Sequence, residues 1–416
     1  MKYLNKIKNK DFIDKLFWRS LQIFGRQGLG FLIFLLLAYF LTPEEYGRYV
    51  YVFTVVILII TFCDFGFSAV SAKYASEYNY SDREKLEQLL FNIFILIGGV
   101  SSVVIIGFFI FGKIIFGGLF DLILLIIPIV FFAPIISLYD GLFRGVGKFK
   151  KLTVIVLSTG LVNLILTLIF TKYYGIKGAL ISQTVYYFIA FVISVITYGS
   201  FKIKYNKKII KEVAKYSVIV GISSVAYLLY SRIDVVFLGN YGYIKEIAYY
   251  EIANKILTFV MLPFSIIASV ISPIIARYSA QKDFNKIYQL FIKILKYSSL
   301  LSFSICICVF IFNNIFLQYI PKYNSPVLHE ILNLMTIVFF SQMLNEIFPI
   351  GFVMSTGHAK LSSIFLFIFG LANVLFDYIF INVFGFIGII YSTILVRTTA
   401  DLLFIYTYYK ILKKLK

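Results

Sequence analysis

Predominantly apolar runs of 18 or more residues recur along the whole of this 416-residue sequence. A run of that length forms a helix that crosses the roughly 30 Å hydrocarbon core of a bilayer. The runs lack the alternation of apolar and polar residues that membrane barrel strands show. Only 14% of the residues are charged, whereas about a quarter are charged in a soluble domain. The sequence therefore predicts an all-α, polytopic membrane protein.

We expect about twelve transmembrane helices joined by short loops. The first run is too long for a signal peptide, and we interpret it as a retained span. The longest hydrophilic stretch, residues 201–215, is a lysine-rich cytosolic linker between a six-helix lobe at 1–200 and another at 216–416. The expected spans are 17–41, 48–70, 89–111, 119–139, 152–171, 178–200, 216–238, 248–274, 296–319, 327–354, 361–383 and 386–408.

Lysine and arginine gather in alternate loops, and they give the chain a formal net charge of +19. Loops on the cytosolic side of a membrane carry the excess of basic residues. We therefore expect a multi-pass protein of the cytoplasmic membrane with both termini in the cytosol. The basic loops also attract anionic membrane lipid, and their distribution does not suggest a nucleic-acid partner. The opposite loops hold only Arg48, Lys113, Lys172, Lys177, Lys245 and Lys322.

An internal repeat relates the two halves at an offset of 210 residues. Because each half has an even number of spans, the two six-helix repeats point the same way. Such parallel repeats are typical of transporters, and they predict a binding site near the middle of the membrane between the halves. The matched pairs are Gly147 and Gly357, Gly160 and Gly370, Asn163 and Asn373, Gly175 and Gly385, Gly178 and Gly388, Ser182 and Ser392, and Ala190 and Ala400.

Four basic residues fall inside expected spans: Arg26, Arg232, Lys255 and Arg397. A charge near the centre of a membrane helix costs at least ~2.5–3.5 kcal/mol on insertion scales, so such residues commonly face a wet cavity or a partner. We expect these four to line a cationic cavity that binds a phosphate or pyrophosphate. Arginine suits this ligand because its planar guanidinium offers paired donors to phosphate oxygens.

Acidic residues inside the spans are candidate ion-coupling groups or charge partners. Asp64 could pair with Arg26 or carry a coupling proton or sodium ion, and Asp377 could carry one as well; solvation at a helix end is the alternative for both. Arg232 and Asp234 are two residues apart and point to different faces of a helix, so at least one needs a partner on another helix. The five acidic candidates are Asp64, Asp234, Glu251, Asp377 and Asp401.

Two of these acidic residues lie four positions from a basic residue on the same expected helix. Glu251 precedes Lys255, and Arg397 precedes Asp401. Residues four apart are neighbours on a helix surface. Each pair could therefore close as a local ion pair, which is the alternative to a role in binding.

Nothing in the sequence predicts a metal centre or a catalytic group. Cys63, Cys306 and Cys308 lie in apolar segments, and we interpret them as packing residues. His329 and His358 are far apart in the sequence, so a histidine metal site is not expected. No Gly-Lys-Ser or Gly-Lys-Thr phosphate loop occurs, so we do not expect the chain to use ATP. We expect no cofactor other than a coupling H⁺ or Na⁺.

Five dispersed segments carry a family resemblance. They are Thr-Pro-Glu-Glu-Tyr-Gly-Arg-Tyr at 42–49, Asp-Phe-Gly-Phe-Ser at 64–68, Gly-Leu-Phe-Arg-Gly-Val-Gly-Lys at 141–148, Ser-Arg-Ile-Asp at 231–234 and Ser-Thr-Gly-His-Ala-Lys at 355–360. With the twelve spans, they resemble the Wzx-type polysaccharide flippases of the multidrug/oligosaccharidyl-lipid/polysaccharide exporter superfamily.

The resemblance implies a non-enzymatic flippase of the bacterial cytoplasmic (inner) membrane. Its cargo would be an undecaprenyl-pyrophosphate-linked oligosaccharide, an O-antigen or capsule repeat unit of polysaccharide biosynthesis. Two six-helix lobes would alternate between inward and outward openings, with Arg26 and Arg397 on the pyrophosphate and Arg232 on the outer side. We expect a monomer whose partners are the lipid-linked oligosaccharide, membrane lipid and other polysaccharide-assembly proteins.

Two alternatives remain open from the sequence. A drug or ion antiporter of the same superfamily would instead move cationic cargo. A membrane glycosyltransferase or polymerase would need catalytic acids in a sizeable outer loop, but the expected outer loops are short. The only Asp-x-Glu triplet, Asp82 and Glu84, lies in an expected cytosolic loop.

Overall fold

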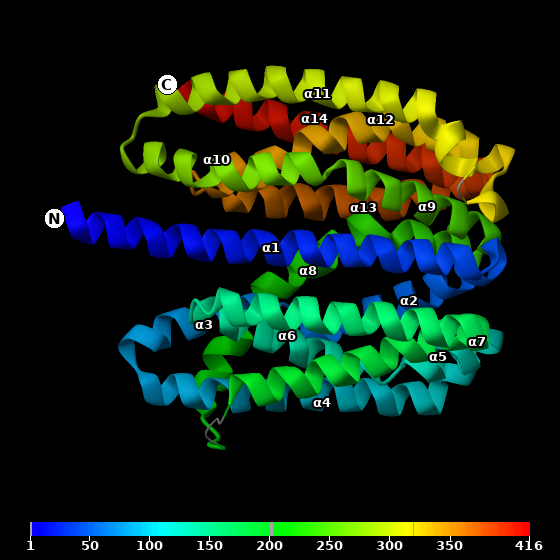
Figure 1. The fold of residues 1–416 in the computed structure, drawn as a ribbon, viewed down its shortest axis with the longest axis horizontal. Coiled ribbons are helices and arrows are strands. Elements are labelled where there is room, and N and C mark those ends of the chain that lie inside the picture. The colour runs from blue at the N-terminus through cyan, green and yellow to red at the C-terminus, as the bar shows by residue number, and fades with distance from the viewer. Residues whose placement is uncertain (1, 200–202, 319) are drawn as a thin grey trace. The chain divides into compact units, whose positions relative to one another are not determined.

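The computed structural model describes residues 2–199, 203–318 and 320–416, and these are helical with no strand among them (Figure 1). The expected all-α class is therefore confirmed. The first helices are α1 (Lys2–Phe40), α2 (Pro43–Asp64), α3 (Phe67–Ser81), α4 (Arg83–Phe116), α5 (Phe120–Ile126), α6 (Ile129–Gly145) and α7 (Phe149–Tyr198). They are followed by α8 (Lys207–Asn240), α9 (Ile244–Val260), α10 (Leu262–Ala280), α11 (Phe284–Gln318), α12 (Pro326–Phe348), the π-helical turn Pro349–Met354, α13 (Ala359–Phe384) and α14 (Phe386–Leu415).

The chain forms two compact units. The first comprises Met1–Leu41 and Val52–Val225, and the second comprises Thr42–Tyr51 and Ala226–Lys416. Helix α8 begins at Lys207, so the last part of the expected linker is helical, while residues 200–202 lie outside the described part of the chain. The division into lobes at 1–200 and 216–416 stays a prediction.

Ten segments of the described chain are long and apolar enough to cross a membrane. The segment Phe149–Tyr198 contains two of the expected spans, because Gly175, with φ 54° and ψ −135°, interrupts α7. The expected fourth and eighth spans are each built from two shorter helices, α5 with α6 and α9 with α10. The structure thus accounts for the expected spans, and the chain is a multi-pass membrane protein.

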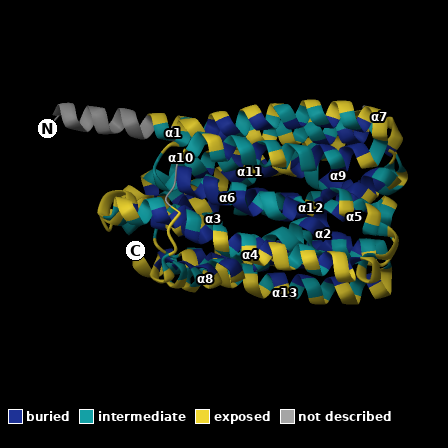
Figure 2. Ribbon diagram, turned by 90° about the horizontal axis from the view of Figure 1, so that it is seen from below, coloured by how far each residue is buried: buried dark blue, intermediate teal, exposed yellow. Residues whose placement is uncertain are grey.

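Exposed residues lie along the outward faces of several helices, such as α4 (Figure 2), and many of them are large and apolar. On α4, Val103, Ile106, Ile110 and Ile114 are 70, 58, 61 and 83% exposed, and they recur every three to four residues. A contiguous apolar stripe of this kind is unfavourable in water. It is favourable against lipid tails, so this face of α4 contacts the bilayer.

Paired glycines of the sequence repeat occupy equivalent backbone positions. Gly147 and Gly357 have φ of 71° and 81° and end a helix in each unit. The amide that follows each donates to a carbonyl five residues earlier, at 2.9 Å in both units. Glycine favours this left-handed helix end because it has no Cβ to clash. The two glycines of this pair therefore have the same backbone conformation and the same hydrogen-bonded turn in each unit.

A second pair, Gly178 and Gly388, permits close packing of helix ends. A Cβ on Gly178 would lie 1.9 Å from the Phe170 carbonyl oxygen, and a Cβ on Gly388 would lie 2.0 Å from that of Phe380. No side chain fits at either position without a backbone shift. These glycines fix how each pair of consecutive spans turns back on itself.

We expect Gly388→Ala to destabilise the protein by about 1–3 kcal/mol, because the added methyl group overpacks against backbone. The matched control is Gly107→Ala in α4, where nothing lies within 4 Å of the added Cβ. Thermal unfolding of the purified variants in detergent measures the effect. Equal unfolding midpoints for the two variants would contradict the prediction.

Candidate functional site

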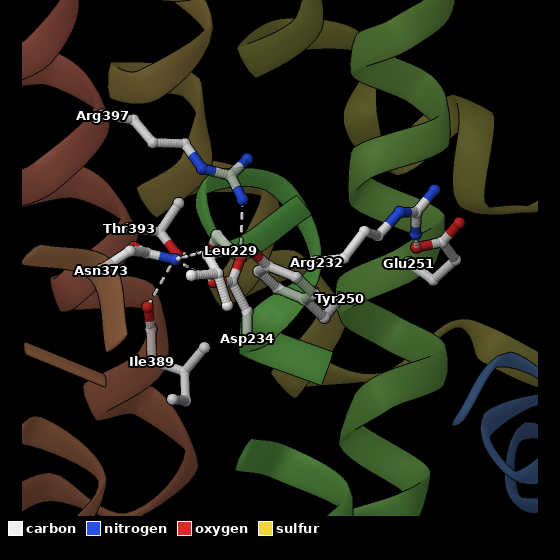
Figure 3. Close-up of polar contacts among 9 residues, drawn as sticks. All are labelled: Leu229, Arg232, Asp234, Tyr250, Glu251, Asn373, Ile389, Thr393 and Arg397. Carbon is white, nitrogen blue, oxygen red and sulfur yellow. Dashed lines mark hydrogen bonds and ion pairs between the residues drawn. The ribbon is translucent and has the colours of Figure 1, made fainter. Parts of the chain in front are cut away.

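A buried ion pair lies at the centre of the candidate site in the second unit (Figure 3). The Arg397 Nη2 atom, from α14, lies 2.6 Å from Asp234 Oδ2, from α8. The two side chains are 7% and 0% exposed. Removal of both charges from solvent is costly, so the arrangement is stable only with close geometry and further hydrogen bonds.

Those further hydrogen bonds converge on the Asp234 carboxylate from two other helices. Asn373, on α13, donates to Asp234 Oδ1 at 2.6 Å. The Tyr250 hydroxyl, on α9, donates to Oδ2 and lies 3.3 Å from Thr393 Oγ1. Four helices of the second unit therefore meet at one carboxylate (Figure 3).

Asp377 lies one turn beyond Asn373 on α13 and is fully buried. Neither of its carboxyl oxygens makes a hydrogen bond of ordinary geometry with the described residues, although Ser392 and Asp234 are close enough to interact electrostatically. The Asn373 Oδ1 and Ser392 Oγ atoms are also unpartnered there. Unpaired buried oxygens are costly, so Asp377 is a candidate to carry a proton or to bind a cation.

Asp401 does not form the local ion pair with Arg397 that the spacing allowed. Its oxygens accept from Ser341 Oγ at 3.0 Å and Asn345 Nδ2 at 2.7 Å. These donors from α12 satisfy the carboxyl group, while the guanidinium of Arg397 is directed across to α8 and Asp234. Tertiary packing therefore selected a partner on another helix over the neighbour on the same helix.

The buried charges of this cluster do not balance. Three carboxyl groups, those of Asp234, Asp377 and Asp401, are at most 1% exposed, and of these only Asp234 forms an ion pair with Arg397. If all three were ionised, the cluster would carry an excess of negative charge in a medium that disfavours it. The cluster is therefore suited to take up protons or a cation.

A second charged group in this unit, around Glu251, has an excess of positive charge. Glu251, with a side chain 5% exposed, lies 2.8 Å from Arg232 Nη1 and 3.4 Å from Lys255 Nζ. The expected Glu251–Lys255 pair is present, and Arg232 has the partner on another helix that its position required. The two cations remain about one-third exposed, at 33% and 34%. Two cations thus share one carboxylate and retain donors for an anion.

Arg26, in the first unit, has a different partner from the one considered in the sequence. Its Nη2 atom lies 3.3 Å from Asp140 Oδ2, whose other oxygen is 2.6 Å from Arg144 Nε. Asp64 does not pair with Arg26, and its buried Oδ1 has no hydrogen-bond partner among the described residues. Sequence analysis missed Asp140 because the expected span ended at residue 139, whereas α6 continues to Gly145.

The first unit repeats the position of the buried cluster but not its charge. At an offset of 210 residues, Asn163 corresponds to Asn373 and Thr167 to Asp377. In the first unit Asn163 exchanges long hydrogen bonds with Gln183, and Thr167 lies 3.3 Å from Ser182 Oγ. Neutral groups satisfy one another there, so the charged cluster belongs to the second repeat alone.

Several uncharged members of the site gave no distinct signal in the sequence. Asn373 was visible as a repeat residue but not as a ligand, and the hydroxyl and amide partners resemble many other polar residues in the spans. Only their convergence in space reveals them. They are Tyr250, Ser341, Asn345, Asn373 and Thr393.

A double-mutant cycle tests the Asp234–Arg397 pair. We expect Asp234→Asn and Arg397→Gln each to destabilise the protein by about 3–5 kcal/mol, because each leaves the other charge buried without its partner. The double variant should lose much less than the sum of the two. Unfolding free energies from detergent titration provide the measurement, and additive losses would contradict a direct pair.

Comparisons with known proteins place the chain in a family. The model of a family described as "Polysaccharide biosynthesis protein" matches residues 12–279, and the MatE model matches residues 219–379. No curated protein matches the sequence. The first match covers well over half of the chain, so the family is shown.

Solved structures with the same fold are transporters and a flippase. An inward-facing multidrug resistance MATE transporter of the MOP superfamily is 15% identical, with a TM-score of 0.75 over 93% of this chain and 96% of its own. The lipid II flippase MurJ in an inward closed conformation is 17% identical, with a TM-score of 0.72 over 94% and 87%. A MOP superfamily transporter from Pyrococcus furiosus is 14% identical, with a TM-score of 0.60 over 97% and 96%.

At these identities the structural matches establish the fold, and the family match establishes the kinship that five dispersed motifs suggested. The chain therefore belongs to the polysaccharide biosynthesis protein family, and it is a multi-pass membrane protein with the fold of the MOP superfamily of transporters and flippases.

Proposed function

We propose that this chain is a flippase that moves an undecaprenyl-pyrophosphate-linked oligosaccharide, such as an O-antigen or capsule repeat unit, across the bacterial inner membrane. Translocation would run from the inner to the outer leaflet by alternating access, with both termini in the cytosol. The observation that carries the proposal is Arg26, whose side chain is 61% exposed although it lies in a membrane-spanning helix. Membership of the polysaccharide biosynthesis family supports this class of cargo.

The exposed cations are the candidate contacts for the pyrophosphate. Arg26 in the first unit, and Arg232 with Lys255 in the second, each retain donors beyond their carboxylate partners. Charge-assisted bonds from guanidinium to phosphate are strong and geometrically specific. The lipid tail would stay in the bilayer, because its transfer to a polar cavity would be unfavourable.

Arg397 has a different part in this proposal from the one expected from the sequence. Its side chain is 7% exposed and directed at Asp234, so it is not among the proposed pyrophosphate contacts. It acts instead as the internal counter-charge of the buried carboxyl cluster. A drug antiporter is the weaker candidate, because Arg26, Arg232 and Lys255 are positive and would repel cationic cargo.

Leaflet exchange of a labelled lipid-linked oligosaccharide in proteoliposomes tests the proposed function. We expect Arg26→Ala to lower the rate at least tenfold, because a charge-assisted bond to phosphate contributes about 1.5–3 kcal/mol. Arg48→Ala, which removes an exposed arginine bonded to its helix neighbour Glu44, is the control. Wild-type rates for Arg26→Ala, or efflux of fluorescent cations without lipid exchange, would contradict the proposal.

We further propose that a coupling Na⁺ or H⁺ binds at Asp234 and Asp377. Their oxygens, together with Asn373 Oδ1 and Thr393 Oγ1, form a buried set of acceptors with excess negative charge. Buried oxygens of membrane helices are typical ligands for such ions. With Asp234 paired to Arg397, Asp377 contributes the uncompensated negative charge of this set, and a monovalent cation would balance it.

A cation at this position would compete with Arg397 for Asp234. Asp401 lies one helical turn from Arg397, so the guanidinium has an alternative acceptor on its own helix. Ion binding would thus exchange an ion pair between α8 and α14 for one within α14. This exchange would link ion occupancy to helix packing.

Asp377→Asn tests the coupling site while preserving side-chain shape. We expect the variant to lose the dependence of leaflet exchange on an imposed Na⁺ or H⁺ gradient, because the amide removes the charge that binds the cation. Asp121→Asn, at an exposed aspartate of α5, should keep the dependence. The two gradients are imposed separately in proteoliposomes, and an unchanged response of Asp377→Asn to both would exclude this site.

A further inference from the structure

Two sequence motifs of unassigned role meet in the first unit. Arg144, from Gly-Leu-Phe-Arg-Gly at 141–145, donates from Nη2 to Ser68 Oγ at 2.7 Å, and Ser68 ends the Asp-Phe-Gly-Phe-Ser segment. The proposed pyrophosphate contacts do not use either residue. Their meeting indicates that the two motifs form one structure at the boundary of α3 and α6.

Glycines bring the two helices close enough for this contact. A Cβ on Gly141 would lie 2.1 Å from the Ser68 carbonyl oxygen, and a Cβ on Gly145 would lie 2.5 Å from that of Ala72. Two small residues four positions apart allow helix backbones to approach closely in membranes. The spacing of the motif thus holds the Arg144 guanidinium beside Ser68 and Asp140.

Basic groups outnumber acidic groups around Asp140. Arg144 and Arg26 both pair with this carboxylate, and Arg19 lies within electrostatic range of all three. Asp64 also lies within electrostatic range of Arg144. Three guanidinium groups against two carboxylates leave net positive charge, the reverse of the buried cluster in the second unit.

A buried donor at the same place has no acceptor. Gln22 lies between Arg19 and Arg26 on one face of α1 and is 1% exposed. Its Oε1 atom accepts from Arg19 at 2.6 Å, but its Nε2 atom has no hydrogen-bond partner among the described residues. An unmet buried donor next to surplus guanidinium groups is matched by an anion with several acceptor oxygens.

We propose that Arg19, Gln22 and Arg144, with Arg26, form a docking site for the phosphate headgroup of a lipid at the end of the first unit that carries Lys148 and Lys150. Asp140 holds two of the guanidinium groups in place until the ligand arrives. Asp140 Oδ2 lies 3.3 Å from Arg26 Nη2, whereas Asp140 Oδ1 lies 2.6 Å from Arg144 Nε. Arg26 is therefore the side chain that moves to the ligand. The inference rests on the proposed function, and it adds Arg19, Gln22 and Arg144 to the substrate-binding residues.

The docking site has a built-in reporter. Trp18 is the single tryptophan of the chain and precedes Arg19 on α1. Its ring lies 5.3 Å from Lys150 Nζ, and its carbonyl accepts from Thr153 Oγ1 at 2.7 Å. An anion that binds beside it changes the local charge, so its fluorescence reports occupancy directly.

The full-length protein in nanodiscs of zwitterionic lipid is titrated with a C15 prenyl pyrophosphate and, separately, with inorganic pyrophosphate, while Trp18 fluorescence is recorded. We expect saturable binding of the prenyl compound that weakens about tenfold in Arg144→Gln and in Arg19→Gln. Lys172→Gln removes an equal charge from an exposed position of α7, outside this cluster, and should bind as the wild type does. Thermal unfolding midpoints identify any variant that is simply misfolded. Arg19 forms no ion pair with the described residues, so a folded Arg19→Gln variant gives the decisive affinity measurement.

Wild-type affinity in folded Arg19→Gln and Arg144→Gln, or an equal loss in Lys172→Gln, would overturn the docking site. Equal affinity for the two compounds would overturn its assignment to a lipid headgroup, because a soluble anion would then be the ligand. The outcomes are separable from the proposed function. Retained leaflet exchange with unaltered binding in these variants refutes the docking site alone, whereas specific binding without any leaflet exchange refutes the flippase alone.

Discussion

The cost of placing charge in an apolar medium governs this molecule. Every ionisable group inside a membrane-spanning helix must find a partner, a ligand or a proton, because hydrocarbon provides no solvation. The pair between Arg397 and Asp234 meets this requirement with close geometry and with hydrogen bonds from Asn373 and Tyr250. Helices α8, α9, α13 and α14 are joined at that point, and the local packing of the second unit depends on it.

Two charged clusters, one around Asp140 in the first unit and one around Asp234 in the second, meet the same constraint with opposite charge balances. Buried carboxyl groups exceed guanidinium groups in the cluster around Asp234, whereas guanidinium groups exceed carboxylates around Asp140. An excess of acid accommodates a proton or cation, and an excess of base accommodates an anion. A flippase coupled to an ion gradient requires both kinds of site, so the charge distribution is consistent with the function proposed.

The repeated glycines show how a duplicated scaffold can carry different chemistry in its halves. Gly147 and Gly357, like Gly178 and Gly388, meet the same backbone requirement in each unit. Side chains at equivalent positions diverged, as Thr167 and Asp377 do, because a change there leaves the turns intact. Conserved turns with variable polar residues allow the second half to gain a charged cluster without loss of the fold.

Hydrophobic run length, spacing and residue type were sufficient to predict the all-α membrane fold, the repeat and the charges inside the spans. The Glu251–Lys255 pair also followed from spacing, since it closes within one helix. The pairing of Arg397 with Asp234 and of Arg26 with Asp140 became evident from the packed helices. Those partners lie on other helices, and neither helix periodicity nor composition specifies which faces meet when helices pack.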